Sequence, residues 1–508
     1  MEKNFDSDFC GSLPINFINS IQDYGYLVVI EKNTFSIIQL SENLPPILGT
    51  TTAGLLHQDI RTFLKKEHVQ LLEKYIEEES DNNIAPFILK LIHNKNELIV
   101  STCLHIYADY FILELEKHAL EQEHSFIAIY SRIKHLLSSI DNSRTVQESC
   151  ETTIQAIKDF SGFDAVLLYQ FDSSWNGTVL AEINKDEVPR YLGLKFPASD
   201  IPRKAREMYL KNIYRLIPDR NYQAVKLFPV INPINNTFTD LADCNLRAVP
   251  AVHLEYMANM NLGASMSIRI IKDGRLWGLI SCHHSSAKHL SYEECSVFEL
   301  ISTLISNKIS SMINLEDYQF DKNLQHIRNE LTEKMYKLHH FIHAFFDVND
   351  TNILDLFRAT GAIAVINGAI ETIGEVMDTD QVENLVLWAQ AKKIDHVFST
   401  DHFSDLYDDA QDYIKIASGI IIIPIDLERG DFIFVLRCEV ERTINWAGNP
   451  NEAINFEADG KKYHPRNSFE VWKEIVKNQS LKWHQTEIEM AAHLKSVLFE
   501  FNMRYFRD

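Results

Sequence analysis

Apolar and polar residues alternate along the first quarter of the chain, which is the pattern of half-buried strands. The stretch YGYLVVIEKNTFSIIQLSEN at 24–43 predicts a hairpin whose turn is EKNT. The stretch APFILKLIHNKNELIVSTCLHIYADYFILELE at 85–116 predicts three more strands. Because polar turns separate these strands, we expect a small α+β domain over residues 20–120.

A second α+β unit is predicted in the middle of the chain. Apolar and charged residues recur with helical period over 126–160, and FDAVLLYQFD at 163–172 predicts a strand that enters a turn. The stretch GASMSIRIIKDGRLWGLISCHH at 263–284 predicts a hairpin, because Asp273-Gly274 suits a tight two-residue turn.

The stretch KFPASDIPRKAREMYLKNIYRLIPDR at 195–220 predicts an amphipathic helix between these strands. Ser199 or Asp200 is a favourable N-cap, and Pro202 is tolerated in a first helical turn. The apolar residues that recur every three or four positions are Ile201, Ala205, Tyr209, Ile213 and Leu216. Taken alone, this pattern favours a packed helix with a capping acid and, in Arg215, a surface charge.

A long helix and a third α+β unit are predicted for the remainder. No Pro or Gly interrupts residues 290–345, so we expect a connecting or inter-subunit helix longer than a normal globular one. Within 345–508, GIIIIPI at 419–425 predicts a buried strand, and residues 483–506 predict a final helix. Residues 441–474 contain few apolar side chains and predict a long irregular loop, a kind of segment that often carries function.

Composition places the chain among ordinary globular proteins. Of its 508 residues, 45% are hydrophobic and 24% are charged, and this length predicts two to four domains. The net charge of −22 makes nucleic acid and anionic membranes poor partners. Seven widely spaced cysteines without a CxxC pair favour a reducing, cytoplasmic setting. We see no signal peptide, and no apolar run is long enough to span a bilayer.

Polar side chains between residues 169 and 283 suit an anionic ligand. In SMSIRI at 265–270, a period of two places Ser265 and Ser267 on one strand face. A strict two-residue hairpin would set His283 opposite Ala264, on the other face, unless a bulge intervenes. The set that suits a planar, aromatic, anionic ligand is Tyr169, Tyr209, Arg215, Arg247, His253, Tyr256, Ser265, Ser267 and His283. Each residue alone would equally fit a solvated strand face or a structural histidine.

Other chemistries are not indicated. The sequence contains no GxxxxGK[ST], HExxH or GxSxG pattern, so phosphate-loop, zinc-protease and serine-hydrolase sites are not expected. The stretch CHH at 282–284 offers three potential metal donors, but neighbouring strand residues point in different directions. We therefore expect no metal site.

Five short motifs carry a resemblance to a known family. They are CGSLPINFINSIQ at 10–22, FPASDIP at 196–202, LWGLISCHH at 276–284, WAG at 446–448 and PRNSF at 465–469. In this order they resemble the photosensory region of bacteriophytochromes, which are red/far-red photoreceptors that bind a bilin. The resemblance covers nearly the whole chain. The chain departs from the family in SIQDYG, where Asp23 and Tyr24 replace Pro and His, and in Ala447, where Gly is frequent.

The resemblance implies an α+β fold of three domains whose antiparallel sheets are flanked by helices. It implies a chromophore-attachment segment at 1–18, a PAS domain at 19–125, a bilin-binding GAF domain at 126–312 and a PHY domain at 313–508. The PHY domain would carry a tongue at about 438–475, and a long helical spine would connect the domains. A figure-of-eight knot is also implied, in which the segment around Ile21 threads a loop of the GAF domain.

The resemblance also implies a set of chromophore contacts. Cys10 would form a thioether with biliverdin IXα, and Val252 stands where plant and cyanobacterial phytochromes carry their cysteine, which favours biliverdin. The B-ring propionate would be held by Tyr209, Arg215 and Arg247, and the C-ring propionate by His253, Ser265 and Ser267. Asp200 and His253 would surround the central pyrrole water, and His283 would bond the D-ring carbonyl. The remaining walls would be Tyr169, Phe196, Ile201 and Tyr256.

The implied cycle begins when red light isomerises the C15=C16 bond and the D ring flips. Asp200 would pair with Arg466 in the dark Pr state and with Ser468 in Pfr, as the tongue refolds from strand to helix. The chain would then be a homodimeric, cytoplasmic sensor and not an enzyme. Its output domain or response regulator would lie outside this sequence, and the parent protein could be a light-regulated histidine kinase. The alternative is a PAS/GAF sensor of another anionic small ligand without photochemistry.

Overall fold

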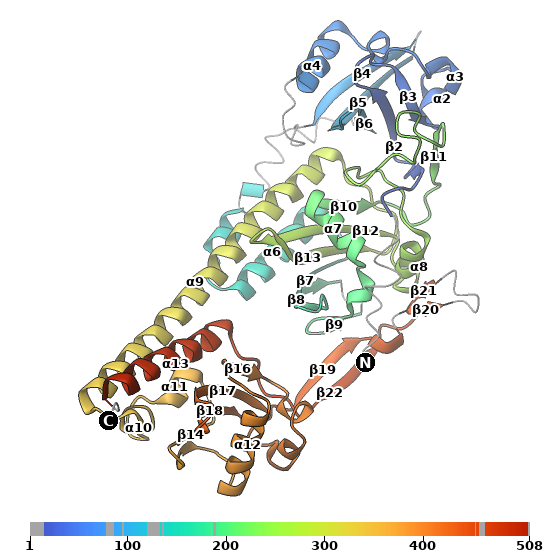
Figure 1. Ribbon diagram of the computed structural model, residues 1–508. Helices are drawn as coiled ribbons and strands as arrows, with labels where there is room; N and C mark the ends of the chain where they lie inside the picture. The colour runs from blue at the N-terminus through green and yellow to red at the C-terminus, as the bar shows by residue number, and fades with distance from the viewer. Residues whose placement is uncertain are drawn as a thin grey trace. The chain divides into compact units, whose positions relative to one another are not determined.

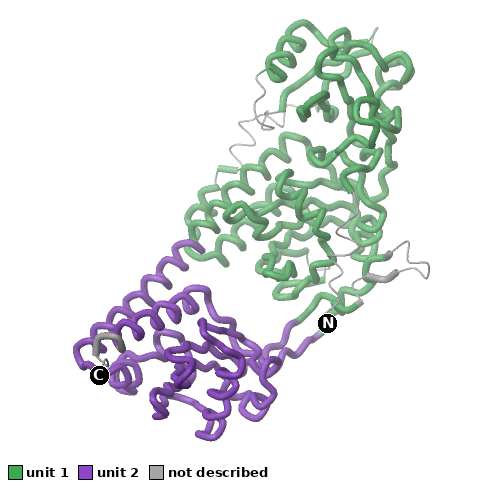
Figure 2. The backbone as a smooth tube through the Cα atoms, in the orientation of Figure 1, with its two compact units in different colours: residues 1–312, 445–472 green, residues 313–444, 473–508 purple. Residues whose placement is uncertain are grey.

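The computed structural model describes residues 15–77, 86–93, 96–118, 133–134, 137–185, 189–452, 454–456 and 463–505 (Figure 1). Backbone contacts divide the chain into two units (Figure 2). One consists of residues 1–312 and 445–472, and the other of residues 313–444 and 473–508. We refer to residues 445–472 as the tongue segment, because they group with the first unit although the chain on both sides belongs to the second.

The first sheet of unit one has seven strands in the order β1-β11-β3-β2-β6-β5-β4. Its strands are β1 (Ser20–Ile21), β2 (Gly25–Glu31), β3 (Ile37–Ser41), β4 (Phe87–His93), β5 (Asn96–Ile106), β6 (Tyr110–Lys117) and β11 (Val225–Phe228), and the short helices beside it are α2 (Leu44–Ile47), α3 (Thr52–Leu55), η2 (Ile60–Phe63) and α4 (Lys66–Glu77). The predicted hairpin and the three further strands are therefore confirmed. One face of the sheet covers a core that includes Val28 and Leu113, and the other packs against residues 225–246.

The second sheet of unit one has the order β10-β12-β13-β7-β8-β9-β19-β22. Its strands are β7 (Ala165–Phe171), β8 (Gly177–Asn184), β9 (Lys195–Phe196), β10 (Tyr214–Ile217), β12 (Ala264–Lys272), β13 (Arg275–His284), β19 (Arg442–Ala447) and β22 (Val471–Val476), and the helices are α6 (Val146–Ser161), η4 (Ala198–Asp200), α7 (Arg203–Lys211) and α8 (Ala251–Asn259). Asp273 and Gly274 form the predicted two-residue turn, and both have positive φ, of +51° and +72°.

The predicted helix over 195–220 is wrong in its extent. Helix α7 covers only Arg203–Lys211, and neither Ser199 nor Asp200 caps it, because Pro202 occupies the N-cap position. Leu216 is not on a helix face, since residues 214–217 form strand β10 and pair with β12. Apolar residues at helical spacing continue into residues 214–217 only by coincidence, because pairing with β12 sets the conformation of this segment.

Residues 20–22 lie between two segments that follow far along the chain. Strand β1 pairs with β11, and on the other side the Gln22 amide donates to the Leu246 carbonyl at 2.7 Å. The Ala248 amide donates to the Ser20 carbonyl at 3.0 Å, and Ile21 is fully buried. Residues 20–22 are thus hydrogen-bonded to residues 225–226 on one side and to residues 246–248 on the other, and the knot stays a prediction.

The long helix is confirmed. Helix α9 runs from Tyr292 to Leu338 and ends where His339 adopts the left-handed conformation, with φ +51°. The five-residue helix α10 (Phe341–Phe345) follows. No helix in the described ranges is long and apolar enough to cross a membrane.

Unit two contains a five-stranded sheet of order β15-β14-β18-β17-β16 that is buried on both faces. Its elements are α11 (Ile353–Phe357), β14 (Gly361–Ile366), β15 (Ala369–Gly374), α12 (Thr379–Ala391), β16 (Phe398–Thr400), η5 (Phe403–Asp405), η6 (Asp408–Tyr413), β17 (Gly419–Asp426), β18 (Asp431–Arg437) and α13 (Gln485–Tyr505). The predicted strand at 419–425 is β17, and its alternate isoleucines enter two different cores, which explains why the run is uniformly apolar.

Residues 441–474 are not an irregular loop as predicted. They contain β19, the turn η7 (Pro450–Glu452), the short antiparallel pair β20 (Ile454–Phe456) and β21 (Tyr463–Pro465), and β22. Strand β19 joins the second sheet through a parallel pairing of Trp446 with Lys195. The low apolar content reflects strands that bury little surface, such as β22, whose residues are exposed or half-buried throughout.

Candidate ligand-binding site

A cavity of about 250 Å³ lies against the second sheet of unit one. All twelve residues that the sequence analysis predicted for the middle of the chain line it: Tyr169, Phe196, Asp200, Ile201, Tyr209, Arg215, Arg247, His253, Tyr256, Ser265, Ser267 and His283. Val252 and Pro465 also line it. Cys10 lies outside the described residues.

The β12–β13 hairpin brings His283 to the same face as the serines. A bulge at Ile270/Ile271 shifts the register by one residue, so that Ser265 pairs with His283 and Ser267 with Ser281. Of the two registers that the sequence left open, the structure has the one with a bulge, so His283 is not opposite Ala264. Ser281 also lines the cavity. Sequence reasoning missed it, although a period of two from His283 would have found it.

Arg215 joins this polar face from β10. It pairs in register with Ser267, which in turn pairs with Ser281, so three neighbouring strands present one row of polar side chains to the cavity. Tyr209 approaches the row from α7, and a hydrogen bond to Ser267 partly offsets the effect of burial, which raises the pKa of Tyr209. The strand position of Arg215, and not a helix, accounts for this alignment.

Arg247 is buried and Arg215 is half-buried, and neither cation has an acidic partner among the described residues. In the described part of the chain neither forms an ion pair with Asp or Glu, and their guanidinium groups donate only to backbone carbonyls. Burial lowers the pKa of both, and the pKa of Arg247 falls to about 9, mainly through burial and further because Arg215 adds a second positive charge. Two adjacent guanidinium groups without a carboxylate have the chemistry to bind an anion.

Two histidines complete the cavity, and both are neutral at neutral pH. Burial lowers the pKa of His253 to about 4, with a smaller contribution from Arg215. Burial also lowers the pKa of His283 to about 4, with a smaller contribution from His253. Each neutral imidazole offers one donor and one acceptor. His253 stacks on Tyr256 with ring centroids 6.0 Å apart and an interplanar angle of 8°.

The tongue segment contacts the cavity through a buried ion pair. Arg466 donates to the Asp200 carboxylate, and the two side chains are 3% and 6% exposed. The Tyr256 hydroxyl donates to the same carboxylate at 3.1 Å. Burial raises the pKa of Asp200, and Arg466 and Tyr256 oppose this shift. Ser468, the other predicted partner of Asp200, is exposed and accepts a hydrogen bond from the Glu470 amide at 3.3 Å.

Helix α8 holds the tongue segment at two further points that sequence reasoning missed. The Asn259 amide donates to the Arg466 carbonyl at 3.1 Å, and Glu255 pairs with the His464 ring at 2.9 Å. Glu255 and Asn259 are four residues apart and share a helix face, which is the only signal that the sequence offers for this role.

Family models for three domains match the chain in succession. A PAS fold matches residues 10–118, a GAF domain matches residues 145–309, and a phytochrome region matches residues 324–505.

Similar proteins were found along nearly the whole chain. Cyanobacterial phytochrome B from Nostoc is 36% identical over 97% of this chain and 66% of its own length, and a bacteriophytochrome from Xanthomonas campestris is 27% identical over 98% and 79%. The chain thus spans about two thirds of the length of the first of these relatives. Among solved structures, the Stigmatella aurantiaca phytochrome photosensory core module matches with a TM-score of 0.83 and 31% identity over 98% of this chain and 99% of its own. A bacteriophytochrome from the photosynthetic bacterium R. palustris matches with a TM-score of 0.84 and 28% identity over 97% and 99%.

Proposed function

The chain belongs to the phytochrome family, and we propose that it is a photosensory module that holds a linear tetrapyrrole in the cavity and transmits light absorption to the tongue segment. The observation that carries this proposal is the pair of Arg215 and Arg247, which have no acidic partner among the described residues, in the lining of a cavity that also contains the aromatic side chains of Tyr169, Phe171, Trp175, Phe196 and Tyr256. A ligand that satisfies both features has acid groups and a conjugated body.

The residues present fit such a group. A bilin bears two propionate carboxylates, and Arg215 and Arg247, with Tyr209, would hold the first. His253, Ser265 and Ser267 would hold the second, since the neutral imidazole and the hydroxyls can each donate a hydrogen bond. When bound, the tetrapyrrole supplies red-light absorption and a double bond that isomerises on excitation.

Other residues of the cavity would surround the ring that turns. Tyr169, Phe196 and Tyr256 would wall it, with Ile201 beside them, and His283 would donate to its carbonyl. Asp200, beside His253, would contact the central pyrroles. We propose biliverdin IXα as the specific bilin and Cys10 as its thioether partner. Val252 supports this choice, because it lines the cavity but cannot form a thioether.

The signal would leave the cavity through Asp200. We propose that the contact between Asp200 and Arg466 belongs to the dark state, and that after illumination Asp200 releases Arg466 and accepts from Ser468 as the tongue changes conformation. We further propose the domain limits 19–125, 126–312 and 313–508 after a segment at 1–18. The chain would act as a cytoplasmic homodimer coupled to an output domain or response regulator, and it would have no enzymatic activity of its own.

Reconstitution with biliverdin tests the function. We expect the purified chain to develop red absorption, and red light to change the spectrum reversibly. Arg247→Gln should weaken bilin binding by roughly tenfold to a hundredfold, since removal of one charge-assisted carboxylate contact costs about 1.5–3 kcal/mol. Arg275→Gln, at the exposed hairpin turn, is the matched control. A chain that binds the pigment but ignores illumination would instead be a sensor without photochemistry, and one that stays colourless would refute the bilin itself.

A second experiment tests the attachment. Cys10→Ser and the parent chain are loaded with biliverdin, denatured and separated on a gel that is read for zinc-induced bilin fluorescence. We expect a fluorescent band for the parent and none for Cys10→Ser. Cys150→Ser is the matched control and should keep the band, because that thiol is buried in α6.

A further inference from the structure

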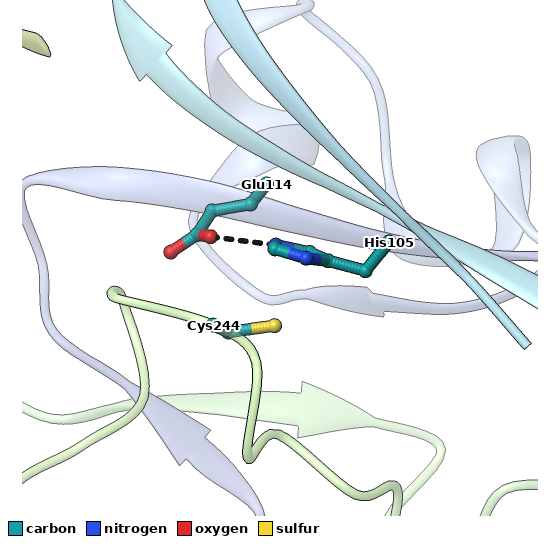
Figure 3. A group of neighbouring side chains, drawn as sticks. All are labelled: His105, Glu114 and Cys244. Atoms are coloured by element: carbon teal, nitrogen blue, oxygen red, sulfur yellow. Dashed lines mark hydrogen bonds and ion pairs between the residues drawn. The ribbon is translucent and has the colours of Figure 1, made fainter. Parts of the chain in front are cut away.

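His105, Glu114 and Cys244 lie together where the first sheet meets a loop of the middle of the chain (Figure 3). Their ligand atoms all lie within 4.8 Å of one another. The His105 ring nitrogen Nε2 is 2.9 Å from a carboxylate oxygen of Glu114. Glu114 and Cys244 are buried, and His105 keeps 15% of its side chain exposed, so an ion could reach the cluster from that side.

Strand geometry explains why the three side chains converge. Cys103 pairs with Glu114 and His105 with Ile112, so His105 and Glu114 are diagonal neighbours on one face of the β5–β6 pair. That face packs against residues 225–246, and Cys244 lies in the same buried cluster of side chains. The three residues therefore come from two strands and one loop that tertiary packing brings together.

We propose that His105, Glu114 and Cys244 form a site for one Zn²⁺ ion that joins the first sheet to the loop bearing Arg247. One nitrogen, one oxygen and one sulfur donor suit zinc, whose tetrahedral sites commonly combine these atoms. Zn–N and Zn–O bonds near 2.0 Å and a Zn–S bond near 2.3 Å place ligand atoms about 3.3–3.6 Å apart. Shifts of about 1 Å from the observed separations are therefore enough. Water would occupy the fourth position from the exposed side of His105.

Charge balance favours a divalent ion. A thiolate and a carboxylate neutralise its two positive charges, so the buried site would carry no net charge. Without the ion, burial raises the pKa of the Cys244 thiol, and the nearby Glu114 adds to this effect, so the thiol keeps its proton. On coordination the sulfur binds the ion and its proton leaves to solvent.

The site is supported from behind in the way that metal ligands usually are. The second oxygen of Glu114 accepts the Leu246 amide, which would fix the carboxylate when its first oxygen turns to the ion. Leu246 precedes Arg247, whose guanidinium lines the cavity. The same segment accepts hydrogen bonds from Gln22, at the Asn245 carbonyl and the Leu246 carbonyl. Zinc would thus stiffen the backbone that positions one of the two anion-binding arginines.

Metal binding by the purified chain, with any bilin left in place, tests the proposal. The chain is dialysed against Zn²⁺ or Co²⁺, bound metal is counted by mass spectrometry, and Co²⁺ is followed by its thiolate-to-metal charge-transfer absorption. We expect one ion per chain and a thiolate band that bilin nitrogens cannot produce. Cys244→Ser should abolish the band, and His105→Gln should lower the affinity at least tenfold.

Matched variants decide between a metal site and a simple hydrogen bond. Cys150→Ser, which removes another fully buried thiol, should bind metal like the parent. His105 lies at the edge of the cluster, so His105→Gln keeps the test valid even if Cys244→Ser fails to fold, which circular dichroism would reveal. Absence of stoichiometric binding in the parent, or equal binding and an unchanged band in His105→Gln, would leave only a structural His–Glu contact and overturn the proposal.

Discussion

Two buried arginine–carboxylate pairs in this molecule differ in how completely their hydrogen bonds are met. In unit two, Arg437 donates from Nε to the Arg358 carbonyl, from Nη1 to the Lys482 carbonyl and from Nη2 to Glu487. Its guanidinium also stacks 3.8 Å from the Trp483 ring centroid. In unit one, Arg466 donates from Nη2 to Asp200, but its Nε and Nη1 have no hydrogen-bond partner among the described residues.

We call the Arg437–Glu487 pair the fixed joint and the Asp200–Arg466 pair the changeable contact, because the two differ in how easily a partner can be exchanged. Glu487 accepts from Arg358 and Arg437 and from the His484 amide, so every change of partner would leave buried donors unmet. Among the described residues Arg466 has two donors without a partner, and an unmet buried donor costs about 1–3 kcal/mol. A rearrangement that satisfies them would offset part of the loss of Asp200, so this contact is better suited to a change of partner than the Arg437–Glu487 pair. An arginine–carboxylate pair can therefore be of either kind, depending on whether backbone carbonyls accept the remaining guanidinium hydrogen bonds.

Breaking the fixed joint should have the largest effect on stability. Glu487→Gln leaves Arg437 buried beside a neutral amide, and we expect a loss of about 3–5 kcal/mol in the free energy of unfolding. Urea unfolding followed by tryptophan fluorescence measures this loss, since Trp483 lies on Arg437.

Glu489→Gln is the control for that measurement. It lies two residues away on α13 and is exposed, so we expect a change below about 0.5 kcal/mol. The comparison fails if Glu487→Gln costs no more than Glu489→Gln, because the joint would then contribute nothing that the exposed residue does not.

Breaking the changeable contact should cost less and should alter the light response. Asp200→Ala strands Arg466, but Asn467 and Ser468 beside it are exposed, so the guanidinium can turn to water. We expect a loss of about 1–3 kcal/mol in unfolding free energy and no stable Pfr photoproduct. The measurement is the spectrum after red light and its decay in darkness. Normal photoconversion with decay at the parent rate would contradict the role of Asp200.

Glu207→Ala, at an exposed position on α7, is the matched control and should photoconvert as the parent does.

Acidification provides an independent check on the parent chain. Burial raises the pKa of Asp200, so on lowering the pH its carboxylate takes up a proton before an ordinary Asp would. The ion pair with Arg466 is therefore present above that pKa and lost below it.

Residue patterns were sufficient to predict most strands and the long helix, because period two and the absence of Gly and Pro are local properties. They failed at 195–220, where pairing of β10 with β12 overrides a helical repeat. At the β12–β13 hairpin they left two registers open, because the bulge at Ile270/Ile271 has no distinctive residue. In both places the deciding interaction is a neighbouring strand.

The candidate site shows the same limit. The residue types that line the cavity could be chosen from short motifs and from family resemblance, and all twelve of them line it. The contact of Asp200 with Arg466 spans 266 positions and follows no local pattern, so only the family resemblance could predict it, and the structure contains it. The cluster of His105, Glu114 and Cys244 could not be predicted, since it depends on which loop packs against the outer face of β5 and β6.

A substitution at Gly448 can weaken the Asp200–Arg466 contact without removing either charge. Gly448 has φ +96°, and a Cβ there would lie 2.7 Å from Arg466 Nη1 and 2.3 Å from the Ser468 carbonyl oxygen. Gly448→Ala should therefore destabilise the observed packing of the tongue segment by about 1–2 kcal/mol. We expect amide hydrogen exchange at residues 466–471 to accelerate roughly tenfold.

Gly193→Ala controls for backbone strain alone. Gly193 has φ +76°, and a Cβ would meet no atom within 4 Å. If both variants leave exchange in the tongue segment at the parent rate, the packing around Arg466 does not hold this segment closed.

The smallest effect is expected at the rim of the same contact. Glu255 and His464 form a pair whose side chains are 38% and 44% exposed, and pairs of this kind contribute less than about 1 kcal/mol. His464→Gln should therefore raise exchange in the tongue segment less than about fivefold, because Asn259 still holds the Arg466 carbonyl. At a pH at which His464 is protonated, high salt should reproduce much of that change in the parent chain, since it screens exposed charges more than the buried Asp200–Arg466 pair. If His464→Gln accelerated exchange in the tongue segment as much as Gly448→Ala does, the Glu255–His464 pair would hold this segment in place, and the packing around Arg466 would not.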